Sequence, residues 1–120
     1  RYTCFVTPET RLPMMYMDDA IRASLEVMGA DTSKIKIRTS YNLAAMSFSV
    51  KELIEAIKKH IPEFICDYKP DNRQQIADSW PRRLDDSAAR KDWSWKHEFD
   101  LDKMTVEMLK HLKIKFKQGE

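Results

Sequence analysis

A chain of 120 residues can form one small domain or part of a larger one. Its 42% hydrophobic and 33% charged residues are typical of globular proteins and exclude a disordered or collagen-like chain. The basic residues are spread out and the net charge is only +2, so nothing indicates a nucleic-acid partner. No apolar run approaches the roughly 18 residues of a membrane-spanning helix, and no membrane partner is expected.

The chain opens within a strand-like run, Tyr2–Val6, and its first residue is Arg1, so we expect it to be cut from a longer protein. A second apolar run, Leu12–Met17, is too short for a helix. A helix capped by Asp18 or Asp19 is expected next.

The apolar positions Ile21, Leu25 and Met28 predict the buried face of this helix. We expect Gly29 to end it in a left-handed conformation. Alternating apolar residues then predict a strand over 35–43.

The clearest helix start in the chain is a capping box of Ser49 and Glu52, with Phe48 and Leu53 as its hydrophobic staple. This helix is expected to stop at Pro62.

Further strand and helix signals fill the remainder of the chain. A strand is expected over 64–68, a loop with a helical turn over 72–81, and a short helix after Asp85 or Asp86. Trp93 and Trp95 are expected as core anchors before a last helix capped by Asp100. The alternation of strands and helices indicates an α/β fold, and the short segments indicate a lobe more than a complete sheet.

The motifs of catalysis and cofactor binding are missing. With only Gly29 and Gly119, the chain has no Gly-rich phosphate loop, and no tyrosine is followed by a lysine four residues later. Cys4 and Cys66 are expected to be two buried thiols, and the cysteines and histidines lack the spacing of a metal site. We therefore assign no catalytic, cofactor-binding or metal-binding residue to this chain.

The layout resembles the C-terminal part of the extended short-chain dehydrogenases, which include nucleotide-sugar epimerases and dehydratases. The matching features are an Arg before a short strand, an Asp-led helix, a Tyr-Asn strand and a Ser-started helix, here Arg11, Asp18–Asp19, Tyr41–Leu43 and Ser49–Glu52. Arg73, the acidic helix start at 85–90 and Trp95 follow in the same order.

Three stretches are similar to the threonine dehydrogenase branch of that family: Thr10–Met17, Ile76–Pro81 and Lys91–His97. Ser94 departs from the branch, where a glycine is expected in a turn. The resemblance implies the oxidation of L-threonine by NAD+ to 2-amino-3-oxobutyrate, with the cofactor and the catalytic Tyr-x-x-x-Lys pair held by an N-terminal Rossmann portion.

It also implies an incomplete domain, namely a substrate-binding lobe plus the last helix and strand of the Rossmann-type half. Residues 18–43 are then expected to pack on the upstream nucleotide-binding sheet. The resemblance further implies a homodimer, located in the cytoplasm of a bacterium (favoured) or in the mitochondrial matrix of an animal.

Three residues are candidates for the substrate site. Trp80 lies beside Pro81 in a segment without helical periodicity and is expected to wall the pocket, with a core anchor as the alternative. Arg11 and Arg73 correspond to arginines that face a diphosphate in nucleotide-sugar enzymes, and here one of them is a candidate for the threonine carboxylate, with structural ion pairs as the alternative. The alternative functions are a nucleotide-sugar epimerase or dehydratase lobe and a non-catalytic α/β binding module.

Overall fold

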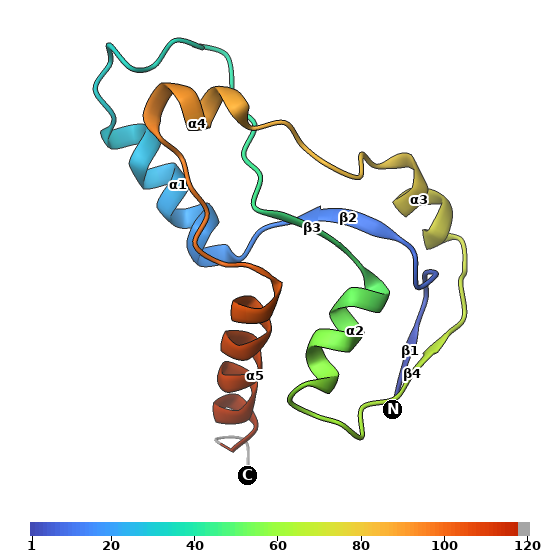
Figure 1. The fold of residues 1–120 in the computed structure, drawn as a ribbon. Coiled ribbons are helices and arrows are strands. Elements are labelled where there is room, and N and C mark those ends of the chain that lie inside the picture. Colours follow the sequence, from blue (N-terminus) through green and yellow to red (C-terminus); the bar gives the residue numbers. More distant parts are fainter. Residues whose placement is uncertain (118–120) are drawn as a thin grey trace.

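The computed structural model describes residues 1–117 as two small sheets and five helices (Figure 1). In chain order the elements are β1 (Tyr2–Cys4), β2 (Arg11–Met14), α1 (Met17–Gly29), β3 (Met46–Ser49), α2 (Val50–Lys58), β4 (Cys66–Tyr68), α3 (Arg73–Ser79), α4 (Ser87–Trp93) and α5 (Leu101–Lys117). No helix in this range is long and apolar enough to cross a lipid bilayer.

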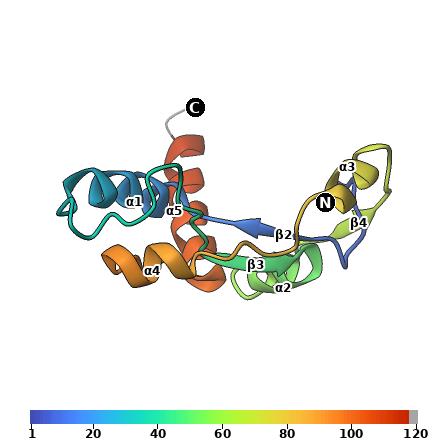
Figure 2. The same cartoon turned by 90° about the horizontal axis from the view of Figure 1, so that it is seen from above.

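The two sheets are both two-stranded. β1 pairs in parallel with β4, and β2 pairs antiparallel with β3, with Arg11 opposite Ser49. The expected strands over 2–6 and 64–68 are therefore present in shorter form. In place of the expected apolar run 12–17, β2 begins one residue earlier, at Arg11, and ends at Met14. Seen from above, the β2–β3 ribbon joins an end that holds α1 and α4 to an end that holds α3 and β4 (Figure 2).

The strand expected over 35–43 is not formed, and this prediction was wrong for the chain as it stands. Residues 35–45 have no regular secondary structure, and the strand lies further on, at Met46–Ser49. A strand needs a hydrogen-bonding partner along its length, and β2 offers one to β3 but not to the preceding segment. Tyr41 and Leu43 instead pack against the core cluster.

Helix α1 differs from its prediction in three ways. It begins at Met17 with no side-chain cap, and Gly29 has no positive φ angle. The expected buried face is exposed, since Ile21, Leu25 and Met28 are 53%, 61% and 73% accessible. The buried face is instead the side that carries Asp19 and Ala23.

The capping predictions for α2 and α5 are confirmed. The Ser49 hydroxyl accepts from the backbone N–H of Glu52 at 3.2 Å, and the Glu52 carboxylate accepts from the Ser49 N–H at 2.6 Å. Asp100 accepts from the N–H of Lys103 at 2.8 Å. These side chains satisfy donors that a helix start leaves without partners.

The core lies between α1 and α4, which run side by side in Figure 1. It consists of Ala23, Ala89, Trp93 and Trp95, with both tryptophans buried as expected. The Trp95 indole donates to the carbonyl of Ala44 at 3.2 Å, which ties the irregular segment before β3 to this core.

Candidate functional site

A polar cavity of about 290 Å³ lies between the β1–β2 loop and the end of α3. Its charged lining residues are two basic ones, Arg11 and Arg82, and two acidic ones, Glu9 and Asp78. Trp80 also lines it. The cavity can therefore receive a small molecule that carries both a positive and a negative group.

Arg11 is held in place by two strong contacts. Its guanidinium donates to the carbonyl of Ser47 and to the carboxylate of Glu52, each at 2.6 Å. The pKa of Glu52 is lowered by the backbone N–H of Ser49 and next by this guanidinium. Arg11 thus lines the cavity with its guanidinium held in a fixed orientation and its charge partly balanced by Glu52.

Trp80 lies directly after α3, with its backbone N–H bonded to the carbonyl of Ala77 at 3.2 Å. The residue is 59% exposed, so it is no core anchor within this chain. It lines both the polar cavity and a neighbouring apolar cavity of about 410 Å³. Thr10 and Ala77 also line both cavities, so the two cavities adjoin at these three residues.

Arg73 lies in the apolar cavity and not beside Arg11. Its guanidinium stacks 3.6 Å above the ring of Phe5 and binds both carboxylate oxygens of Asp71, the closest at 2.6 Å. Hydrogen bonds from Arg73 lower the pKa of Asp71 to about 2. Of the three candidates, Trp80 lines the polar cavity with Arg11 and the apolar cavity with Arg73, and the two arginines line no cavity in common.

Sequence analysis did not identify a polar network that joins α3 to the β1–β2 loop. Gln74 is its centre, with hydrogen bonds to Thr7, Thr10 and Asp78. The spacing of four residues between Gln74 and Asp78 on a helix was a local signal for one of these bonds. The contacts to the two threonines cross more than sixty residues and leave no such signal.

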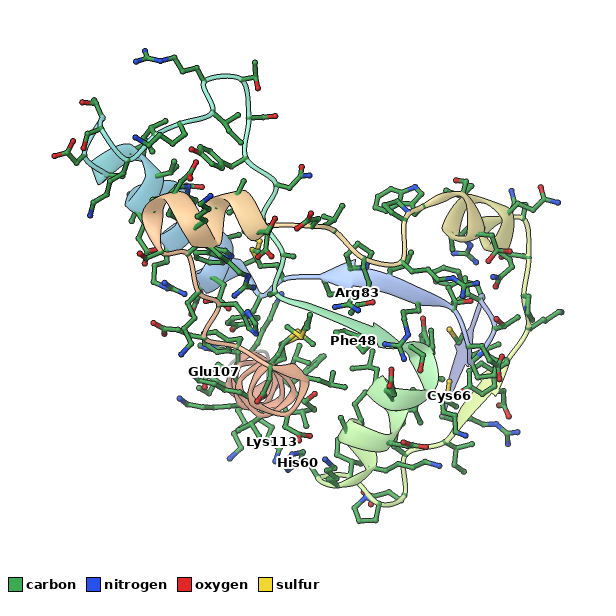
Figure 3. All side chains as sticks on the ribbon, turned by 45° about the horizontal axis from the view of Figure 1, so that its top comes forward. Phe48, His60, Cys66, Arg83, Glu107 and Lys113 are labelled. Atoms are coloured by element: carbon green, nitrogen blue, oxygen red, sulfur yellow. The ribbon has the colours of Figure 1, made fainter. Side chains whose placement is uncertain are left out.

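The remaining candidate groups carry no site. Cys4 is buried as expected, whereas Cys66, labelled in Figure 3, is only half-buried, contrary to the expectation. Burial raises the pKa of the Cys66 thiol. Neither forms a disulfide within residues 1–117. In the same range no three His, Cys, Asp or Glu side chains are grouped as metal ligands.

Comparison with known proteins gives one consistent result. No protein-family model matches the chain. The mitochondrial L-threonine 3-dehydrogenase of Bos taurus is 54% identical over 110 residues, which are 91% of this chain and 29% of that protein. An uncharacterized epimerase/dehydratase of Staphylococcus haemolyticus is 47% identical over 116 residues, covering 96% of this chain and 36% of that protein.

Solved structures agree with the sequence relatives. The L-threonine dehydrogenase of Phytophthora infestans superposes with a TM-score of 0.91 and 50% identity, covering 95% of this chain and 37% of that one. The L-threonine dehydrogenase of Clostridium difficile superposes with a TM-score of 0.92 and 45% identity, covering 96% of this chain and 36% of that one. The chain thus spans about a third of the length of these proteins. The resemblance to the C-terminal part of threonine dehydrogenases and the α/β fold class are confirmed.

Proposed function

We propose that the chain is the substrate-side part of an NAD-dependent L-threonine 3-dehydrogenase, which oxidises L-threonine to 2-amino-3-oxobutyrate. The observation that carries this proposal is the meeting of Arg11 and Trp80 around one cavity of mixed charge. L-threonine carries a carboxylate and an ammonium group, and a site for it needs a partner for each. The similarity to solved threonine dehydrogenases supports the same substrate.

In this proposal Arg11 faces the threonine carboxylate, because Glu52 and the carbonyl of Ser47 already fix its guanidinium. Trp80 closes the pocket from the lobe side and keeps water from the path of the hydride. Arg73 has the weaker claim to the substrate, since it lines the apolar cavity and not the cavity of mixed charge.

The described residues do not fit a dinucleotide. At the turn from β3 into α2, the carboxylate of Glu52 accepts from the backbone N–H of Ser49 and so occupies the start of the helix. A pyrophosphate needs that position open and lined by glycine. NAD is therefore assigned to an N-terminal Rossmann portion.

We also propose that residues 18–43 pack on the sheet of that portion. Three large apolar side chains on α1, Ile21, Leu25 and Met28, support this because they are more than half exposed in the chain alone. The unformed strand over 35–43 supports it as well, since an added sheet would supply the missing partner.

The epimerase or dehydratase alternative needs Arg11 and Arg73 on one diphosphate. The two lie on different cavities, and each is bound to a carboxylate within the chain. The mixed-charge cavity also disfavours a dianion. The non-catalytic binding module lacks any such specific support, because the similar solved structures of Phytophthora infestans and Clostridium difficile are L-threonine dehydrogenases.

The mammalian relatives are mitochondrial by name, and bacterial relatives are known, so the proposed location is the matrix in an animal or the cytoplasm in a bacterium. A homodimer of the full-length enzyme is proposed on the same resemblance.

Trp80→Ala in the full-length enzyme tests the function. We expect kcat/KM for threonine to fall by roughly ten- to several-hundredfold, with the KM for NAD+ nearly unchanged, because the cofactor is held elsewhere. Arg83→Ala, an exposed change in the neighbouring loop, is the control (Figure 3). An unchanged kcat/KM for threonine in Trp80→Ala would contradict the proposal.

A further inference from the structure

Helix α3 carries Trp80 at its end and yet has no buried residue of its own. Apolar packing therefore does little to fix the position of this seven-residue helix. Its first turn is anchored by the stacking of Arg73 on Phe5. The later residues depend on polar contacts.

Gln74 supplies these contacts. Its side-chain oxygen accepts from the backbone N–H of Thr7 at 2.8 Å and from the hydroxyl of Thr10 at 3.2 Å. Its amide nitrogen donates to the carboxylate of Asp78 at 2.8 Å and contacts the Thr10 hydroxyl at 3.1 Å. The anchor point in the β1–β2 loop is itself held, because Thr10 is buried and its carbonyl accepts from the backbone N–H of Val50 at 3.1 Å.

The orientation of the Gln74 amide follows from chemistry alone. A backbone N–H can only donate, so the atom facing Thr7 is the oxygen, and an ionised carboxylate can only accept, so the atom facing Asp78 is the nitrogen. One side chain thus links the loop that leads into Arg11 with the last turn before Trp80. The network therefore adjoins both groups of the proposed site, since Thr10 directly precedes Arg11 and Asp78 lies two residues before Trp80.

We infer that Gln74 is a positioning residue that sets Trp80 against the polar cavity. It contacts neither the substrate nor the reacting atoms in this inference, and it acts through Asp78 and the end of α3. The inference rests on the proposed role of Trp80.

The test is a set of variants of the full-length enzyme. Gln74→Glu keeps the acceptor for Thr7 but replaces the donor to Asp78 with a second negative charge. We expect the KM for threonine to rise about tenfold, kcat to change by less than about threefold and the KM for NAD+ to stay constant. Gln75→Glu, one position along on an exposed residue, is the matched control and should match the parent enzyme.

The decisive comparison uses two further backgrounds. When Gln74→Glu is added to Asp78→Asn, the new amide at position 78 can donate to the new carboxylate at position 74. In this background Gln74→Glu should therefore change the threonine KM by less than about twofold. In Trp80→Ala the effect of Gln74→Glu should also vanish, because there is no indole left to position. A full tenfold effect in either background would overturn the inference.

Other results for these variants distinguish the inference from the proposed function. If Trp80→Ala loses threonine activity but Gln74→Glu behaves like Gln75→Glu, the inference fails and the proposed function stands. If Trp80→Ala has normal kinetics, the proposed function itself fails. Loss of the native thermal transition in both Gln74→Glu and its pairing with Asp78→Asn would make Gln74 a structural residue and overturn the inference.

Discussion

The α1–α4 end and the α3 end of the molecule are held together in different ways. Between α1 and α4, Trp93 and Trp95 are buried and Asp19 is fully enclosed. At the other end, α3 buries no residue, and Trp80 is mostly exposed. The first end gains its stability from burial, whereas the second depends on hydrogen bonds and ion pairs near the surface.

This difference separates stability from recognition. Burial of apolar area contributes about 25 cal/mol per Å² to the free energy of unfolding. An exposed ion pair contributes only about 0–1 kcal/mol in total. A loosely packed element can adjust to a small molecule at little cost in stability, and it is this element that carries Trp80. Substitutions at the two ends should therefore change different measured quantities.

Trp95→Ala should have the largest effect on stability. With Trp95 only 2% exposed and its indole bonded to Ala44, we expect a loss of about 3–5 kcal/mol in the free energy of unfolding. Trp80→Ala should lose less than about 1 kcal/mol, because that side chain is mostly exposed. Thermal or denaturant unfolding of both variants in the full-length protein measures the contrast, and equal losses would contradict it.

Asp19→Asn should come next, at about 2–4 kcal/mol. Asp19 is 1% exposed, pairs with Arg22 at 2.8 Å and accepts from the backbone N–H groups of Glu98 and Phe99. Burial acts to raise the pKa of Asp19, but the hydrogen bonds from Arg22, Phe99 and Glu98 outweigh it and hold the pKa below the ordinary value. The carboxylate thus ties the start of α1 to the segment that leads into α5.

The depressed pKa fixes the direction of the pH dependence. A group whose pKa is lower in the folded state stabilises the protein above its unfolded pKa, about 3.9 for aspartate, and loses that contribution as the pH falls through the folded pKa. Unfolding measured from pH 7 down to pH 2 should therefore show a steeper acid loss in the parent than in Asp19→Asn. Parallel curves would show that Asp19 contributes no pH-dependent stability.

Leu25→Ala tests the exposed face of α1. If the upstream portion covers Leu25, the full-length protein should lose about 2–3 kcal/mol. The exposed neighbour Ser24→Ala should change the stability by less than about 0.5 kcal/mol. A neutral Leu25→Ala would show that this face stays open to solvent in the full-length protein.

Some local signals in the sequence were reliable, although the expected cap of α1 at Asp18 or Asp19 and the left-handed Gly29 do not form. The capping box of Ser49 and Glu52 and the cap at Asp100 need only residues a few positions apart, and both form as predicted. The burial of Trp95 also follows from its place before the last helix. Such features depend on short-range geometry, which the sequence determines directly.

Features that depend on distant residues were predicted less well. β3 forms because Met46–Ser49 finds a partner in Arg11–Met14, more than thirty residues earlier, and propensity alone placed the strand too early. The face of α1 was misassigned because periodicity identifies an apolar side but not what covers it. Gln74 was missed because its partners in the β1–β2 loop lie in a distant part of the chain.

Ser94→Gly should have the smallest effect and the opposite sign. Ser94 ends α4 with φ 64° and ψ 32°, and it is the one non-glycine residue within 1–117 with a positive φ. Its backbone N–H bonds to the carbonyl of Ala89, as at helix ends that use the left-handed conformation. The resemblance to threonine dehydrogenases predicted a glycine in this turn, and the backbone supplies the physical reason.

A left-handed conformation is unfavourable by roughly 1–2 kcal/mol for a residue with a Cβ atom, whereas glycine loses about 0.5–1 kcal/mol through its freer unfolded chain. The net expectation for Ser94→Gly is a gain of about 0.5–1 kcal/mol, which corresponds to a rise in Tm of about 1–4 °C. Ser79→Gly, placed where α3 still has helical geometry, should lower the Tm instead, because glycine there brings the entropic loss and removes the hydrogen bond from the Ser79 hydroxyl to the carbonyl of Ile76. Equal shifts in both variants would mean that the conformation of Ser94 is not the source of the difference.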